Sequence, residues 1–87
     1  MDRTALARDD VVVSKVPEGH LLLVMTNMPD DPLSLRFRGT EWSVQYAVAR
    51  GARLASVKGG TLWYTTDAMQ TFEYLETYRA AGDVRPS

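Results

Sequence analysis

The first hydrophobic stretches of the chain are short and lie on either side of typical turn residues. Residues 11–16 (VVVSKV) and 20–26 (HLLLVMT) flank the tripeptide Pro17-Glu18-Gly19. Proline presets φ for a turn and glycine can adopt the left-handed conformation, so this pattern predicts a β-hairpin. The run LLLVM is apolar at consecutive positions, which is typical of a strand covered on both faces.

Alternation between apolar and polar residues is clearest in LSLRFR, residues 33–38. As a strand, this segment places Leu33, Leu35 and Phe37 on one side and Ser34, Arg36 and Arg38 on the other. The preceding NMPDDP is rich in turn-forming residues and is predicted to be a loop.

The segment EWSVQYAVAR, residues 41–50, fits two structures. Ala, Gln, Glu and Arg are good helix formers, so a helix stays open as the alternative. The alternation favours a strand, because four large side chains then share one face: Trp42, Val44, Tyr46 and Val48. Residues 52–58 and 61–65 predict a further hairpin around Gly59-Gly60, a pair suited to a type I′ turn.

A helix is predicted near the C-terminus, ending at about Ala81. Asp67 is a typical N-cap residue, Gln70 follows at the capping-box position, and Gly82 suits the end of the helix. Between them an apolar stripe recurs at helical spacing and consists of Ala68, Phe72, Leu75 and Tyr78.

These elements predict an α+β fold. Its antiparallel sheet has about six strands arranged as hairpins, and the C-terminal amphipathic helix packs on one face of the sheet. We expect a flexible N-terminal arm at residues 1–9, a single domain at 10–82 and a flexible tail at 83–87.

Turn positions decide which side chains share a face of this sheet. A two-residue turn at Arg50-Gly51 gathers Trp42, Tyr46 and Tyr64 in the core and leaves Trp63 among the polar residues of the opposite face. A three-residue turn shifts the pairing by one residue and moves the side chains of the last hairpin to the opposite face. The register through residues 49–52 therefore stays open. The separation of apolar from polar side chains favours the first register.

Composition places the chain among small globular domains. It has 87 residues, of which 45% are hydrophobic and 24% charged, and it contains no cysteine, which excludes disulfides and thiolate metal sites. The first ten residues lack an apolar leader, and LLLVM is too short to span a bilayer. We therefore expect a cytoplasmic protein without membrane contact.

Charge is unevenly distributed along the chain. The net charge of −1 argues mildly against a general nucleic-acid binder, but residues 32–65 carry five Lys and Arg residues against the single acidic residue Glu41. In the favoured register, one polar sheet face carries the candidate binding surface, which consists of Arg36, Arg38, Lys58 and Trp63.

Two functions fit such a surface. One is protein–protein contact, most simply as a homodimer, because one helix covers one side of the sheet and leaves apolar groups on the other. The alternative is single-stranded nucleic acid, held by cations along its backbone and by an aromatic ring on which a base stacks. We favour a small non-enzymatic binding or regulatory module that contacts a protein.

No catalytic residue, metal site or cofactor is predicted. His20, the sole histidine, lies near Glu18 and is interpreted as a solvated turn residue rather than an acid–base catalyst. Asp30-Asp31 lacks the spaced oxygen ligands of a calcium loop and is interpreted as turn chemistry.

Overall fold

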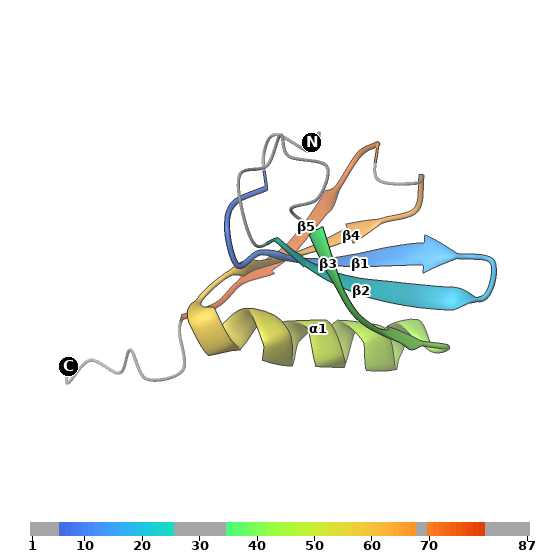
Figure 1. Ribbon diagram of the computed structural model, residues 1–87, viewed down its shortest axis with the longest axis horizontal. Coiled ribbons are helices and arrows are strands. Elements are labelled where there is room, and N and C mark those ends of the chain that lie inside the picture. The colour runs from blue at the N-terminus through green and yellow to red at the C-terminus, as the bar shows by residue number, and fades with distance from the viewer. Residues whose placement is uncertain (1–5, 26–34, 68–69, 80–87) are drawn as a thin grey trace.

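A five-stranded sheet with one helix packed on it forms the described part of the chain (Figure 1). The computed structural model describes residues 6–25, 35–67 and 70–79. The elements are, in chain order, β1 (Val11–Val16), β2 (Gly19–Met25), β3 (Leu35–Glu41), α1 (Val44–Lys58), β4 (Thr61–Thr65) and β5 (Glu73–Thr77). The predicted α+β class is confirmed.

The sheet is mixed rather than antiparallel. Its strand order is β3-β2-β1-β4-β5, and every neighbouring pair is antiparallel except β1 and β4, which run parallel. The parallel pair arises because α1 follows β3 and crosses one face of the sheet before β4 joins β1 (Figure 1). The prediction of antiparallel hairpins followed by a C-terminal helix is therefore wrong in its topology.

The predicted first hairpin is confirmed. β1 and β2 pair from Val16 with Gly19 to Val11 with Val24, around a turn at Pro17 and Glu18. The strand containing LLLVM is also covered on both faces, as predicted. Leu22 and Met25 belong to different clusters of buried residues and are both fully buried.

The helix α1 replaces the strands predicted for residues 41–50 and 52–58. The Ser43 hydroxyl caps its N-terminus by accepting a hydrogen bond of 3.1 Å from the backbone N–H of Gln45. Gly59, at φ 77°, ends the helix in the left-handed conformation. The helical alternative for residues 41–50 is thus correct from Val44 onward, and Gly59-Gly60 is a helix end rather than a hairpin turn.

Small residues let α1 lie close to the sheet. Ala47, Gly51 and Ala55 recur every four residues and are the buried positions of the helix. A Cβ atom at Gly51 would lie 2.8 Å from the Leu62 Cδ1 atom, too close for two carbon atoms. Close packing of the helix on the sheet therefore depends on the absence of a side chain at this position.

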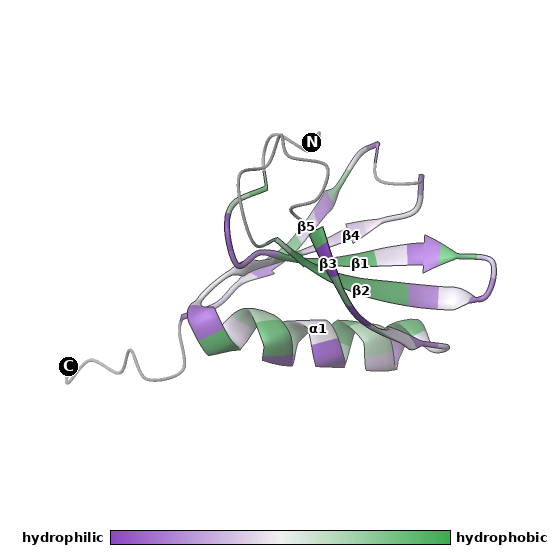
Figure 2. Ribbon diagram, viewed as in Figure 1, coloured by the Kyte–Doolittle hydropathy of each residue, from purple (hydrophilic) through white to green (hydrophobic). Residues whose placement is uncertain are grey.

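The core has two layers, one on each face of the sheet, and apolar residues dominate the central strands β1 and β2 in Figure 2. Under α1 the buried cluster consists of Val11, Val13, Leu22, Ala47, Ala55 and Leu62. The second cluster contains Val12 and Met25 and therefore lies on the other face; it consists of Leu6, Val12, Met25, Trp63 and Phe72.

The predicted C-terminal helix is not observed at residues 70–79. Residues Glu73–Thr77 form β5 instead, which pairs antiparallel with β4 at the edge of the sheet. Asp67 caps a turn rather than a helix, because its carboxylate accepts hydrogen bonds from Thr65 and Thr71. The other residues of the predicted helix, and those of the NMPDDP loop, lie outside the described residues.

The predicted positions of the two tryptophans are reversed. Trp42 is 78% exposed and Tyr46 is 70% exposed, although both were predicted to be core. Trp63, predicted to be on the surface, is only 5% exposed. These differences follow from the change of element, since residues 42–46 lie at the start of a helix whose sheet-facing positions are small.

Candidate functional site

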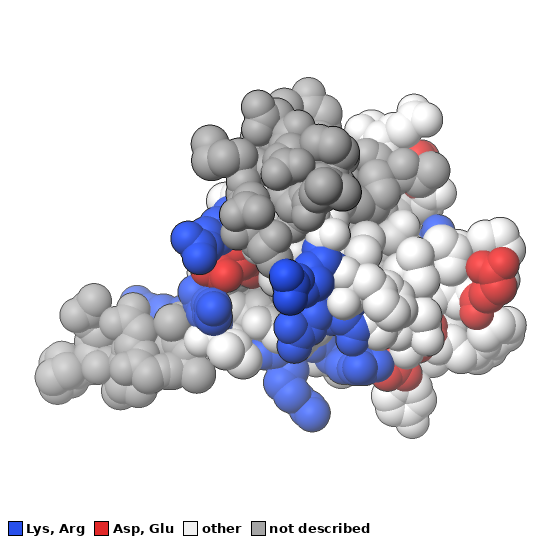
Figure 3. All heavy atoms as spheres, in the orientation of Figure 1, with Lys and Arg blue, Asp and Glu red and all other residues white. Residues whose placement is uncertain are grey.

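A groove lined by cations lies between the sheet and the C-terminal half of α1. It has a volume of about 310 Å³ and is lined by Asp9, Val24, Arg36, Arg38, Leu54, Val57 and Lys58. Figure 3 shows Lys and Arg side chains gathered over β3 and α1 on this side of the molecule. We call this feature the cationic groove. It contains three of the four predicted binding residues.

Strand pairing and the end of the helix bring Arg36 and Lys58 together. Arg36 pairs with Val24 of β2, and Val24 pairs with Val11, which belongs to the cluster under α1. Residues paired across neighbouring strands share a face, so Arg36 lies on the helix side of the sheet. Lys58 is the last residue of α1, where a cation interacts favourably with the helix dipole.

A β-bulge in β3 accounts for the position of Arg38. Leu22 pairs with Gly39 whereas Leu23 pairs with Phe37, which leaves Arg38 as the additional residue between them. Bulges bend an edge strand and redirect its side chains. The alternation in LSLRFR predicted that Arg36 and Arg38 share a side, and both do line the same groove.

The cations of the groove are not neutralised within the described residues. The side chains of Arg36, Arg38 and Lys58 make no ion pair or hydrogen bond with another described residue. Within the described lining, Asp9 is the only acidic residue, and the apolar part comes from Val24, Leu54 and Val57. The groove therefore combines an excess of positive charge with an apolar surface.

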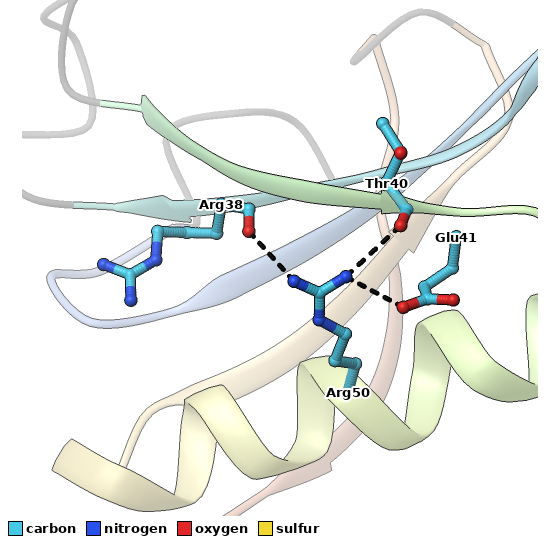
Figure 4. Close-up of polar contacts among 4 residues, drawn as sticks. All are labelled: Arg38, Thr40, Glu41 and Arg50. Carbon is cyan, nitrogen blue, oxygen red and sulfur yellow. Dashed lines mark hydrogen bonds and ion pairs between the residues drawn. The ribbon is translucent and has the colours of Figure 1, made fainter.

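Arg50 differs from these cations because it is committed to β3. Its Nη1 atom lies 2.8 Å from the Glu41 Oε2 atom and donates to the Thr40 carbonyl oxygen at 3.2 Å, while Nη2 donates to the Arg38 carbonyl oxygen at 3.4 Å (Figure 4). The guanidinium group thus covers carbonyl groups of an edge strand, one of the ways in which proteins protect sheet edges. Arg50 has a structural role.

The fourth predicted residue, Trp63, lies away from the cationic groove. Its indole Nε1 donates a hydrogen bond of 2.9 Å to Asp10 Oδ2 within the second cluster, and its ring meets that of Tyr74 edge to face. The same carboxylate accepts hydrogen bonds from the backbone N–H groups of Ala7 at 3.0 Å and Thr61 at 2.9 Å. A buried Trp63 offers no face for a ligand to stack on.

His20 is buried on β2 rather than solvated in the turn, which corrects the sequence-based interpretation. Its Nδ1 atom lies 3.1 Å from the Trp42 carbonyl oxygen, and its ring stacks on Tyr64 at 6.2 Å between centroids. Among the described residues, no group of three or more His, Cys, Asp or Glu side chains is placed to hold a metal ion. Asp30 and Asp31 lie outside those residues.

Three exposed apolar side chains lie at the N-terminal end of α1. They are Trp42, Val44 and Tyr46, and we call the two aromatic residues among them, Trp42 and Tyr46, the aromatic patch. Trp42 immediately precedes the N-cap residue Ser43, and Val44 and Tyr46 lie in the first turn of the helix. The strand predicted for residues 41–50 would have placed these residues in the core. The spacing of Ala47, Gly51 and Ala55 is the signal that identifies the buried side of α1.

Comparison of the chain with models of known protein families, with curated proteins and with solved structures finds no match. In the part of the chain that the structure describes, no helix has the length and apolar character needed to cross a membrane.

Proposed function

We propose that this chain is a small non-enzymatic binding module that acts through protein–protein contact and forms a homodimer through the aromatic patch. The observation that carries the proposal is the exposure of Trp42 and Tyr46, at 78% and 70% of their surface. Large exposed apolar groups mark interaction sites on small proteins, and Trp and Tyr are the residues that contribute most binding energy at interfaces.

The aromatic patch also replaces the surface first expected to support a dimer. That surface was the sheet face predicted to carry Trp63, but Trp63 is buried. His20 and Asp10 have structural partners, since His20 contacts the Trp42 carbonyl oxygen and the Asp10 carboxylate accepts three hydrogen bonds. These positions support a binding role in preference to an enzymatic one.

Sedimentation velocity across a range of protein concentrations tests the dimer. We expect the wild-type chain to shift from monomer to dimer as concentration rises, and the Trp42→Ser/Tyr46→Ser double variant to remain monomeric. The matched control is Phe37→Ser, which removes an exposed aromatic side chain from the sheet face opposite α1. A monomer at all concentrations for the wild-type chain, or equal dimerisation of the double variant, contradicts the proposal.

Single-stranded nucleic acid is the second candidate partner, and the grouping of Arg36, Arg38 and Lys58 in one groove favours it. The stacking role assigned to Trp63 has no support, because that ring is buried. Titration with a labelled oligonucleotide at two salt concentrations tests this candidate, since contacts to several phosphates must weaken steeply as salt rises. Affinity that is independent of salt argues against it.

A further inference from the structure

The cationic groove has no role in the dimer proposed through the aromatic patch. Arg36, Arg38 and Lys58 place three positive charges around one hollow, and none of them is neutralised by another described residue. By contrast, Arg50 in the same region is paired with Glu41 and with backbone carbonyl groups of β3. The fold therefore neutralises one cation of this surface and leaves the three groove cations available.

The groove is also too apolar to be a simple anion site. Val24, Leu54 and Val57 line it between the cations, and its volume of about 310 Å³ is at the lower end of the range of ligand pockets. None of the described residues that line it is aromatic, so these residues offer a nucleobase no stacking partner. Asp9 also lines the groove, and its negative charge repels phosphate and carboxylate groups alike, so the apolar lining is the feature that favours a segment with an apolar side chain.

We infer that the cationic groove binds an acidic segment of another protein, in which carboxylate side chains flank an apolar side chain. The carboxylates pair with Arg36, Arg38 and Lys58, and the apolar side chain packs against Leu54 and Val57. Arginine suits this role because its planar guanidinium group can bind a carboxylate through two hydrogen bonds. This inference concerns a second surface and does not depend on dimerisation through the aromatic patch.

Binding of short fluorescent peptides, measured by anisotropy at low salt, tests the inference. The probe is a peptide in which Glu residues flank a central Leu. Two matched peptides replace every Glu by Gln or the Leu by Gly. We expect binding of the first peptide, at least ten-fold weaker binding of the Gln peptide, and several-fold weaker binding of the Gly peptide.

Charge-matched variants show whether the groove itself binds the peptide. Arg36→Ser/Arg38→Ser should lower the affinity at least ten-fold, and Lys58→Gln several-fold. Arg53→Ser/Arg79→Ser removes the same number of charges from exposed positions that do not line the groove, and should keep affinity within about two-fold. Circular dichroism confirms that each variant is folded. Val57→Ser should abolish the preference for the Leu peptide over the Gly peptide.

Three results would overturn the inference. The first is no binding of the Glu peptide by the wild-type chain. The second is an equal loss of affinity in both double-arginine variants, which would indicate general charge attraction. The third is tighter binding of a single-stranded oligonucleotide that depends on Arg36 and Arg38. Trp42→Ser/Tyr46→Ser should bind the peptide normally, so failure of the dimer and failure of this inference are separate outcomes.

Discussion

At the scale of single residues, Asp10 is the polar group on which the second cluster depends. It is buried, and its Oδ2 atom accepts hydrogen bonds from Trp63 Nε1 and the Ala7 N–H group while Oδ1 accepts one from the Thr61 N–H group. Both oxygens face donors. An amide in place of the carboxylate must therefore direct its own NH₂ group at a donor, whichever way it is oriented.

Asp10→Asn should consequently lower the free energy of unfolding by about 1–3 kcal/mol, the cost of leaving buried donors without an acceptor. Urea unfolding followed by tryptophan fluorescence measures the change. Asp9→Asn is the control, because Asp9 is only partly buried and its φ of 71° is one that Asn tolerates. Equal stability of the Asp10→Asn variant and the wild-type chain would show that the three hydrogen bonds contribute little.

Gly60 lies where two backbone segments meet. A Cβ atom there would lie 2.0 Å from the Asp9 carbonyl oxygen and 2.6 Å from its carbonyl carbon. Backbone atoms cannot move aside as a side chain can, so Gly60→Ala should cost roughly 3 kcal/mol or more. Gly59→Ala should cost only about 1–2 kcal/mol, the penalty of the left-handed conformation at φ 77°. Thermal melts of the two variants compare their losses of stability. A smaller loss for Gly60→Ala than for Gly59→Ala would contradict the prediction.

Asp67 and Thr71 form a pH-sensitive turn. The Thr71 hydroxyl donates to one carboxylate oxygen of Asp67 and the Thr71 N–H group donates to the other at 2.9 Å, which lowers the pKa of Asp67 to about 2. The folded pKa lies below the unfolded value of about 3.9, so the stabilisation is present above about pH 4 and is lost as pH falls through about 2.

Carbon-detected NMR titration of the Asp67 carboxyl group measures this pKa directly. Thr71→Val removes the hydroxyl donor and should raise the midpoint toward the ordinary value. Thr66→Val changes a neighbouring exposed threonine that does not bond to Asp67 and should leave the midpoint unchanged. An unshifted midpoint in Thr71→Val would mean that the hydroxyl does not stabilise the carboxylate.

At the scale of elements, α1 shows why one segment was predicted wrongly and another correctly. Trp42, Val44 and Tyr46 alternate like a buried strand face, yet all three are exposed. The buried positions of the helix carry Ala or Gly. The large apolar residues therefore follow the two-residue period of a strand although the segment is helical. The β1–β2 hairpin was predictable because its turn residues and its apolar run indicated the same structure.

The N-cap of α1 can be tested by comparing its serine with a serine inside the helix. The Ser43 hydroxyl accepts the N–H of Gln45, whereas the Ser56 hydroxyl, within the helix, donates to the Arg53 carbonyl oxygen. Ser43→Ala should lower stability by about 1 kcal/mol through loss of the cap. Ser56→Ala should leave stability nearly unchanged, since alanine is the better helix former. Helical circular dichroism during thermal unfolding compares them, and equal effects would show that the cap is unimportant.

At the scale of the whole molecule, the sequence indicated the α+β class but not the topology. The parallel pairing of β1 with β4 joins segments about fifty residues apart in the chain. Turn residues indicate only local pairing, so they do not predict such a contact. β5 likewise forms at residues whose local pattern favours a helix, because pairing with β4 outweighs that preference. Arg36, Arg38 and Lys58 were identified from their charge and from a predicted polar sheet face, although Lys58 lies on α1. The burial of Trp63 could be known only from the observed sheet register.

The two clusters are connected by β1, and this predicts how the molecule unfolds. Val11 and Val13 belong to the cluster under α1 while Val12 between them belongs to the cluster that contains Trp63. Neither cluster can separate from the sheet without exposing the strand that supports the other. We therefore expect a single cooperative unfolding transition, as in most small domains.

The Trp42→Phe variant allows the unfolding of the two clusters to be compared. Trp63 is then the sole tryptophan, so its fluorescence reports the second cluster. Circular dichroism reports α1, which packs on the first cluster. In urea the two signals should have the same midpoint. Val12→Ala and Val13→Ala shorten neighbouring side chains on opposite faces, and each should lower both midpoints together. If Val12→Ala shifted only the fluorescence transition, the faces would unfold independently, and β1 would not couple them.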